Sequence, residues 1–364
     1  MRPDDPALAR LVDQVRSAHR DKTALDIRGG GTKSFYGRPA RGMALETRAL
    51  AGISSYEPTE LVVTARAGTR LSDLEATLAE RGQCLPFEPP RLGPGGTVGG
   101  MVAAGLSGPA RASAGPLRDY VLGATLLNGR GEVLTFGGQV MKNVAGYDVS
   151  RLMAGSMGVL GVICEVSLKV LPAAPATTTL VFDMDEATAL GALHAWSGEP
   201  LPLNASAWKE GRLHLRLRGA RAAVRAATAR LGGNLMEQAE ADTWWTALRD
   251  QRDAFFAPGD AELADGVNLW RLSVPATAPV LDAAGSRLIE WGGALRWWRT
   301  SAPAATVRGV ASQAGGHATL YRTADKSAGV FAPLSAPLMR IHQALKQAFD
   351  PNNVLNPGRL YADL

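Results

Sequence analysis

Three glycine-rich segments are the first candidates for binding chemistry. They lie at residues 28–32, 93–100 and 155–161. A diphosphate is bound by several backbone N–H groups that converge without Cβ atoms in the way, and glycine-rich turns after strands provide such groups. Together the segments predict a dinucleotide site, although any one of them alone is equally well explained as a tight turn.

Two familiar phosphate-binding motifs are excluded by the positions of their residues. A P-loop requires Gly directly before a Lys-Ser pair, whereas Thr32 stands before Lys33 and Ser34. The Rossmann spacing G-x-G-x-x-G also fails, because Val98 occupies its third glycine position in the second segment. The sequence therefore argues against ATP and NAD as cofactors.

Four separate segments resemble, in order and spacing, the FAD domain of the vanillyl-alcohol oxidase and p-cresol methylhydroxylase (PCMH) type. Residues 27–32 resemble its first pyrophosphate loop, residues 96–101 its second, residues 117–123 its RDxVLG signature, and residues 142–162 its KNxxGYD…GSxGxLGI stretch. The C-terminal residues 349–358 resemble the FDPxxxLNPGK ending of the family's 2-hydroxyacid dehydrogenases. Within the family, the chain looks most similar to the FAD-binding subunits of bacterial glycolate oxidase (glycolate dehydrogenase).

The resemblance implies FAD as the cofactor and implies which residues bind it. They are Arg28, Gly29, Gly30, Gly31, Thr32, Gly96, Thr97, Val98, Gly99, Gly100, Arg118, Asp119, Lys142, Asn143, Gly146, Tyr147, Asp148, Gly155, Ser156, Gly158, Gly161, Val162 and Asn356. Many family members attach FAD covalently through a His near the first loop, but His19 precedes that loop and the next His is His194. We therefore expect non-covalent FAD. Contacts beneath the flavin are expected to differ from the family, because residues 105–108 and Ala114 replace its Asn-Ala-Gly-Gly and Tyr.

Catalytic residues are harder to assign. Oxidation of a 2-hydroxy acid requires hydride transfer to the flavin, a base for the hydroxyl proton and a cation for the carboxylate. Dehydrogenases of the family supply these groups from an HxGDGNxH motif, and most of it is missing at residues 315–322. His317 as base and Arg322 as carboxylate clamp are the remaining candidates, although a lone His near a strand is more often structural. No metal site is predicted.

Three functions remain open. In the first, implied by the resemblance, the chain is a FAD-binding subunit of a multi-subunit glycolate dehydrogenase that oxidises glycolate to glyoxylate. A sister FAD-containing catalytic subunit and an iron–sulfur subunit would be its partners, with the complex peripheral at the inner face of the cell membrane. The second is a self-sufficient FAD-dependent 2-hydroxyacid dehydrogenase. The third is a structural subunit with a vacant flavin pocket.

The composition of the chain limits the partners and the cell compartment that can be expected for it. The net charge is +5 and the isoelectric point about 9.4, but basic residues are scattered with acidic ones between them, so no nucleic-acid partner is inferred. No secretory signal or apolar stretch of membrane-spanning length is present. Cys84 and Cys164 lie far apart, which favours neither a disulfide framework nor a metal knuckle and fits the reducing cytoplasm.

The elements that position these residues predict an α+β protein of two domains. Residues 1–173 are expected to form the PCMH-type FAD-binding domain, itself of two α/β subdomains. Residues 174–364 are expected to form an α+β cap or interaction lobe with an antiparallel sheet, from which residues 333–364 return to the FAD domain. Asp5 is predicted to cap a first helix, Thr69 or Ser72 a second. All eight Trp residues lie from Trp196 onward, and the adjacent pairs are interpreted as core or interface anchors, with the interface preferred.

Overall fold

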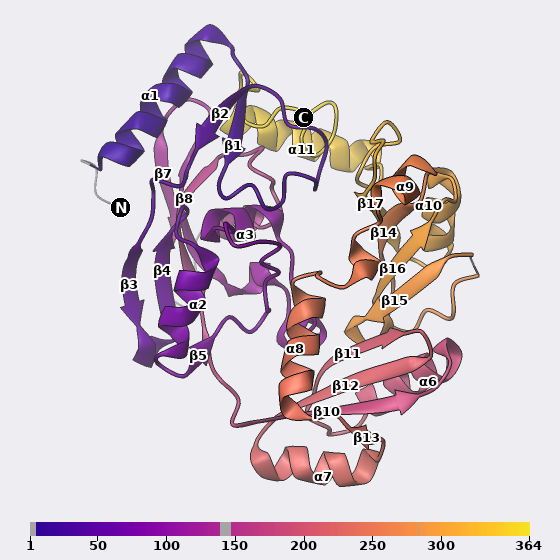
Figure 1. Ribbon diagram of the computed structural model, residues 1–364. Coiled ribbons are helices and arrows are strands. Elements are labelled where there is room, and N and C mark those ends of the chain that lie inside the picture. Colours follow the sequence, from indigo (N-terminus) through magenta and orange to yellow (C-terminus); the bar gives the residue numbers. More distant parts are fainter. Residues whose placement is uncertain (1–4, 139–146, 283) are drawn as a thin grey trace. The chain divides into compact units, whose positions relative to one another are not determined.

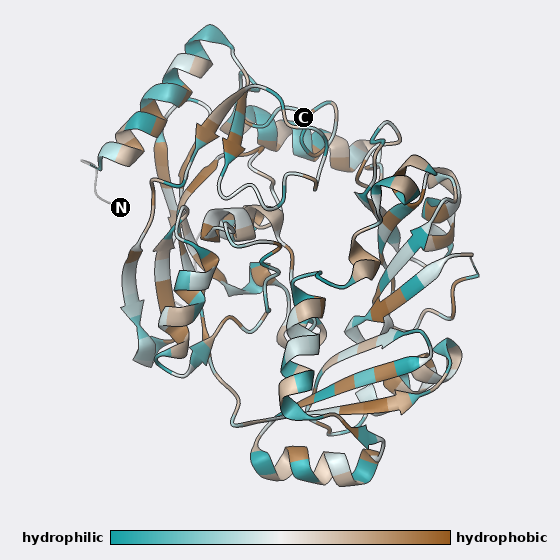
Figure 2. Ribbon diagram, in the orientation of Figure 1, coloured by the Kyte–Doolittle hydropathy of each residue, from teal (hydrophilic) through white to brown (hydrophobic). Residues whose placement is uncertain are grey.

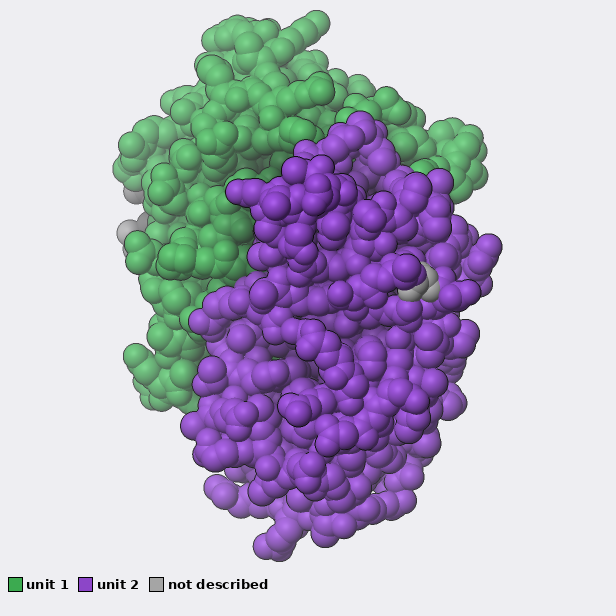
Figure 3. Space-filling view, turned by 45° about the vertical axis from the view of Figure 1, so that its right-hand side comes forward, with its two compact units in different colours: residues 1–106, 116–173, 333–364 green, residues 107–115, 174–332 purple. Residues whose placement is uncertain are grey.

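The computed structural model describes residues 5–138, 147–282 and 284–364, which form two compact units (Figure 1). Unit 1 comprises residues 1–106, 116–173 and 333–364, and unit 2 comprises residues 107–115 and 174–332 (Figure 3). Residues 107–115 thus belong to unit 2, whereas the sequence placed them in the first domain. That the units fold as separate domains stays a prediction.

Unit 1 is built around a five-stranded antiparallel sheet of order β3-β4-β8-β6-β7. Its strands are β3 (Ile53–Glu57), β4 (Val62–Arg66), β8 (Val162–Lys169), β6 (Val121–Leu127) and β7 (Val133–Gly137). Strands β6 and β8 are buried along nearly their whole length, as their continuous apolar sequence predicts for central strands. The sequence predicts a hairpin from residues 121–127 and 132–136, which the Asn-Gly-Arg-Gly segment at residues 128–131 joins, and this is confirmed because β6 pairs with β7 directly.

Two hydrophobic clusters cover this sheet. One contains α2 (Leu71–Ala79) and α3 (Val98–Ala104), and the other contains α1 (Pro6–Asp21) with the parallel strands β1 (Leu25–Arg28) and β2 (Met43–Glu46). Along β8, Ile163 packs in the first cluster while Val162 and Cys164 pack in the second, as the two-residue period of a strand requires. In Figure 2 the hydrophobic colour accordingly follows β1, β2 and the strands of the sheet.

The predicted helix caps have different outcomes. The Asp5 carboxylate accepts from the N–H groups of Ala7 (2.8 Å) and Leu8 (3.2 Å), which confirms the cap of α1. The N-cap of α2 is Arg70, without a side-chain hydrogen bond, so the predicted cap was wrong. The Thr69 hydroxyl instead binds the N–H and the carbonyl of Gly52, both at 3.0 Å.

The C-terminal helix α11 (Ala336–Phe349) belongs to unit 1. The sequence predicts one apolar stripe on this helix that contains Leu338, Ile341, Leu345 and Phe349. Leu345 and Phe349 are partly buried against the first cluster, whereas Leu338 and Ile341 are 48% and 55% exposed. The shorter elements of unit 1 are η1 (Pro58–Glu60), β5 (Gln83–Cys84), η2 (Leu117–Tyr120), α5 (Val149–Leu152) and β9 (Leu171–Pro172).

Unit 2 contains an eight-stranded antiparallel sheet of order β13-β10-β12-β11-β15-β16-β14-β17. Its strands are β10 (Ala176–Asp183), β11 (Leu203–Lys209), β12 (Arg212–Gly219), β13 (Asn234–Leu235), β14 (Asn268–Ser273), β15 (Ser286–Glu290), β16 (Leu295–Thr300) and β17 (His317–Arg322). Its helices are α4 (Arg111–Ala114), α6 (Glu186–Ser197), α7 (Arg221–Leu231), α8 (Gln238–Arg249), η3 (Ala254–Phe256), α9 (Asp260–Ala264), η4 (Trp291–Gly293) and α10 (Ala304–Gln313). The antiparallel sheet predicted for the C-terminal lobe is confirmed.

Most of the paired Trp residues are packing residues of unit 2. Trp245, Trp297 and Trp298 are at most 4% exposed, and Trp244 stacks on His214 with ring centroids 4.0 Å apart. The interface interpretation of these pairs was therefore wrong, because neighbours within the unit already cover the rings. Among the described residues, none of the helices combines the length and the apolar composition needed to cross a bilayer.

Candidate FAD-binding site

A cavity of about 440 Å³ lies in unit 1, where the three glycine-rich segments meet. It is lined by the first loop together with residues of β1, by Ala40 and Thr47 on either side of β2, by α3, and by parts of the third loop and of the C-terminal tail. Of the predicted FAD-binding residues, the lining contains Arg28, Gly29, Gly30, Gly31, Thr32, Thr97, Gly99, Gly100, Gly158, Gly161 and Asn356. Segments that are far apart in the sequence thus build one cavity.

The first loop offers unpaired backbone donors to this cavity. The N–H groups of Gly29, Gly30, Gly31 and Thr32 have no acceptor among the residues that the structure describes. Four successive donors that line a cavity and lack an acceptor fit the oxygens of a diphosphate, because an unpaired N–H group without a solvent or ligand partner is costly. This is the arrangement that the glycine pattern predicted.

The glycines of the first loop are also required by packing against the second loop. A Cβ atom on Gly30 would lie 1.4 Å from the carbonyl oxygen of Gly95, and one on Gly29 would lie 2.4 Å from Oγ1 of Thr97. Both distances are shorter than any real contact. The two loops therefore touch through their backbones, a reason for glycine that the sequence pattern alone did not reveal.

The second loop uses most of its donors within the protein. Val98 donates its N–H to the carbonyl of Thr69 (2.9 Å), Gly99 donates to that of Ala67 (2.8 Å), and Gly100 donates to Oγ1 of Thr97 (3.2 Å). Because these N–H groups are already paired, they are poor candidates for direct phosphate binding. Gly99 and Gly100 shape the cavity wall, while the side chain of Val98 is buried in the core.

The third loop contributes shape rather than charge. Gly158 adopts φ 77°, and a Cβ atom there would lie 2.7 Å from Nδ2 of Asn356. Its absence allows the Asn356 side chain to reach the loop. Four other predicted residues, from the second and third loops, do not line the cavity: Gly96, Gly155, Ser156 and Val162. Val162 is the buried first residue of β8.

Several predicted FAD-binding residues lie elsewhere. Arg118 and Asp119 in η2 have largely exposed side chains, 67% and 52%, and do not line the cavity. Tyr147 is 95% exposed, and Asp148 caps α5 and pairs with Arg151 at 3.0 Å. Lys142, Asn143 and Gly146 lie outside the described residues. A role in FAD binding for this group stays a prediction.

The charge of the cavity suits a dianion. Its lining includes the cationic residues Arg28, Lys33 and Arg359 and the carboxylate Asp26. Asp26 accepts from Nε of Arg28 at 2.6 Å and raises the pKa of that guanidinium. Burial lowers the pKa of Arg359, and the negative charge of Asp26 partly opposes this. The excess of cations favours the diphosphate of FAD.

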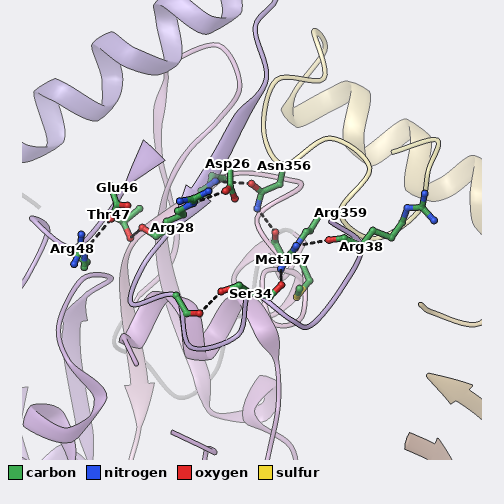
Figure 4. A network of polar contacts seen from close by, with 12 residues as sticks. Asp26, Arg28, Ser34, Arg38, Glu46, Thr47, Arg48, Met157, Asn356 and Arg359 are labelled. Carbon is green, nitrogen blue, oxygen red and sulfur yellow. Dashed lines mark hydrogen bonds and ion pairs between the residues drawn. The ribbon is translucent and has the colours of Figure 1, made fainter. Parts of the chain in front are cut away.

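Two residues of the tail hold the loops of the cavity in place (Figure 4). Oδ1 of Asn356 accepts from the N–H of Ile27 (2.7 Å), and its Nδ2 donates to the carbonyl of Met157 (2.6 Å). The guanidinium of Arg359 donates to the carbonyls of Ser34 (3.0 Å), Tyr36 (2.7 Å) and Arg38. Sequence reasoning missed Arg359, although its position follows the LNPG ending, where the family motif carries Lys.

His317 and Arg322 are not brought together. They occupy the two ends of β17, where His317 pairs with Ser273 and Arg322 with Leu269. Five residue steps along the strand separate these positions by roughly 17 Å. The cation close to His317 is Arg271, which lies diagonally across on β14. Although His317 is exposed overall, partial desolvation of its ring and the charge of Arg271 lower its pKa, which favours the neutral imidazole. The catalytic roles stay predictions.

The lining of the cavity contains neither His nor Cys among the described residues. These are side chains with nucleophilic nitrogen or sulfur atoms through which a flavin can be bonded to a protein. That FAD is held without a covalent bond stays a prediction.

Comparison with known proteins agrees with this site. Residues 7–137 match the FAD binding domain family. The chain is 48% identical over 355 residues to glycolate oxidase subunit GlcE of Escherichia coli, covering 97% of each protein. It is 30% identical over 187 residues to glycolate oxidase subunit GlcD of Bacillus subtilis, covering 49% of this chain and 39% of that protein.

A solved structure supports the fold. The structure of alkyldihydroxyacetonephosphate synthase superposes on this chain with a TM-score of 0.66 at 14% sequence identity, and the match covers 96% of this chain and 74% of that protein. The predicted α+β, PCMH-type fold is confirmed, and the cofactor is FAD. Since the match to the Escherichia coli protein spans nearly the whole of both chains, this chain belongs to the family of FAD-binding glycolate oxidase subunits that includes GlcE.

Proposed function

We propose that this chain is the FAD-binding subunit of a multi-subunit glycolate dehydrogenase that oxidises glycolate to glyoxylate. The observation that carries the proposal is the row of N–H groups at residues 29–32, which have no acceptor among the residues that the structure describes and belong to residues that line a cavity with an excess of cations. The 48% identity to a glycolate oxidase subunit over 97% of the chain supports glycolate as the substrate of the complex. Bound FAD supplies an acceptor for the two electrons that leave the substrate.

Within the complex, we assign to this chain the role of flavin electron carrier or assembly partner. His317 is exposed at the end of its strand, and Arg322, the expected carboxylate clamp, pairs at the other end. A sister FAD-containing subunit then performs the oxidation, and an iron–sulfur subunit carries the electrons onward. The complex is placed at the cytoplasmic face of the cell membrane as a peripheral assembly.

Separate and joint purification tests this proposal. The chain alone should contain about one releasable FAD and should reduce an artificial dye with glycolate only slowly. Co-expression with the sister and iron–sulfur subunits should restore fast reduction. Full activity of the single chain would refute the division of roles, and a colourless, folded chain would favour a structural subunit with a vacant pocket.

One observation favours a second candidate, a self-sufficient 2-hydroxyacid dehydrogenase. The neutral His317 lies beside Arg271, whose guanidinium stands 5.1 Å and 5.9 Å from the ring centroids of Trp291 and Trp297. A neutral imidazole next to a cation is a suitable pair for taking a hydroxyl proton and binding a carboxylate. If the single chain turns over glycolate, His317→Ala should abolish that turnover while leaving FAD bound; unchanged turnover would exclude this role.

A further inference from the structure

The two tail residues that reach the cavity use their polar groups on the protein backbone. Asn356 binds the N–H of Ile27 at the start of the first loop and the carbonyl of Met157 in the third loop. Arg359 binds three carbonyls between residues 34 and 38, at the far end of the first loop. Both side chains belong to residues only 8% exposed. We call this pair the tail clamp.

The unpaired donors of the first loop lie between the two attachment points of the tail clamp. Residues 29–32 follow the Ile27 anchor and precede the carbonyls bound by Arg359. Among the described residues, only the side chains of Ser34 and Lys33 form hydrogen bonds to residues 29–32. Apart from the packing of Gly29 and Gly30 against the second loop, the conformation that presents the N–H groups to a phosphate therefore depends on what holds the two ends of the loop.

Backbone contacts reinforce the same attachment. Leu25 donates to the carbonyl of Val354 (2.7 Å), and Asn356 donates its own N–H to the carbonyl of Leu25 (3.0 Å). Arg38 donates its N–H to the carbonyl of Arg359 (2.9 Å). The tail thus forms backbone hydrogen bonds with β1 and then with the residue at the end of the first loop.

A buried ion pair fixes the base of the tail. Nζ of Lys346 donates to the carboxylate of Asp350 and to the carbonyls of Val159 and Leu355, each at 2.8 Å. The Asp350 carboxylate also accepts from the N–H groups of Val354 (3.1 Å) and Leu355 (2.7 Å). These bonds set the direction in which the chain leaves α11, and so deliver Asn356 and Arg359 to the cavity.

We propose that Asn356 and Arg359 are positioning residues that hold the first loop in its FAD-binding conformation, so that the chain retains FAD only while its C-terminal tail is docked. Arg is suited to this position because its planar guanidinium offers several donors in a fixed geometry to converging carbonyls. Lys, the residue of the family ending, offers three donors and a charge without the planar fork. The inference rests on FAD binding and requires neither glycolate nor a partner subunit.

The test compares Arg359→Met with Arg359→Lys in the full-length chain. Removal of hydrogen bonds from a charged group predicts a Kd for FAD about 10- to 100-fold weaker in Arg359→Met. Arg359→Lys should recover much of this loss. The Kd is measured by titrating the apoprotein with FAD and following flavin fluorescence.

Arg38→Met is the matched control, because it removes a guanidinium from the same loop and keeps the carbonyl that Arg359 binds. The Kd of this variant for FAD should stay within about twofold of the wild-type value, far inside a factor-of-ten change.

Hydrogen exchange of the apoproteins separates positioning from general destabilisation. In Arg359→Met, exchange should accelerate at residues 29–38 and remain unchanged in β6 and β8. An unchanged Kd, or an acceleration equal in all three regions, would overturn the proposal. If Arg359→Met does not fold, Asn356→Ala decides the question: weaker FAD binding with faster exchange confined to the loop supports the tail clamp, and wild-type affinity contradicts it.

Discussion

At the scale of single residues, glycine in the first loop has two separate tasks. Residues 29–32 present unpaired N–H groups to the cavity, and Gly29 and Gly30 also allow the second loop to approach. Phosphate binding needs donors, whereas loop packing needs the absence of a Cβ atom. The two demands coincide at Gly29 and Gly30, which makes these positions the least tolerant of substitution.

We expect Gly30→Ala to abolish FAD binding and to destabilise unit 1. The added Cβ atom would overlap the Gly95 carbonyl at 1.4 Å, so the loops must separate. Overpacking of this kind costs about 1–3 kcal/mol or more of unfolding free energy. Urea denaturation and the flavin content of the purified protein measure the two effects. Gly191→Ala is the control, since its Cβ meets nothing within 4 Å and lies inside α6. Normal FAD content in Gly30→Ala would show that the loops do not meet as described.

At the scale of elements, helix α8 is attached to the sheet of unit 2 by aromatic contacts. Trp244 stacks on His214 of β12, and Trp245 donates its indole N–H to Oγ1 of Thr179 at 2.9 Å. Arg216 of β12 lies 4.7 Å from the centroid of the Trp245 ring. Burial, with a smaller effect of Arg212, lowers the pKa of His214 to about 4. The stacked imidazole is therefore neutral in the folded protein.

This lowered pKa predicts that unit 2 loses stability in mild acid. Between the unfolded pKa near 6.5 and the folded value of about 4, the unfolded chain binds the extra proton, so stability falls as the pH falls through this window. The loss is on the order of 2 kcal/mol after allowance for partial solvent screening.

Chemical denaturation at several pH values between 4 and 7 measures this loss. His214→Phe keeps a ring against Trp244 without a titrating group and should flatten the profile. His194→Gln, at an exposed position of α6, should leave the profile unchanged. An equal slope in the wild type and in His214→Phe would contradict the assignment.

At the scale of the whole molecule, cofactor and tryptophan are divided between the units. Within the described part of the chain, the residues that line the FAD cavity all belong to unit 1, and all eight Trp residues lie in unit 2. Flavin fluorescence therefore reports unit 1, and intrinsic tryptophan fluorescence reports unit 2. This division offers a direct test of whether the units unfold as separate domains.

We expect added FAD to stabilise unit 1 alone. At a free FAD concentration of about 100 times its Kd, linkage predicts a gain of roughly 2.7 kcal/mol for the unit that binds it. In urea denaturation, loss of bound flavin should move to higher urea while the tryptophan transition stays in place. Riboflavin, which lacks the diphosphate, serves as the control ligand. Coincident transitions that move together would show one cooperative unit and refute the two-domain prediction.

The sequence by itself determined the loops of a dinucleotide site, because a diphosphate cradle depends on short segments whose glycines and spacing can be read directly, and its resemblance to the PCMH-type family implied FAD. It also determined the α1 cap, the β6–β7 hairpin and the antiparallel sheet of the second lobe, which follow from local patterns. Only the tertiary structure decided which donors remain unpaired, that Arg359 holds a loop more than 300 residues away, and that Arg271 is the cation beside His317. These contacts join segments distant in the chain, and packing, which leaves no periodic signal in a sequence, sets their geometry.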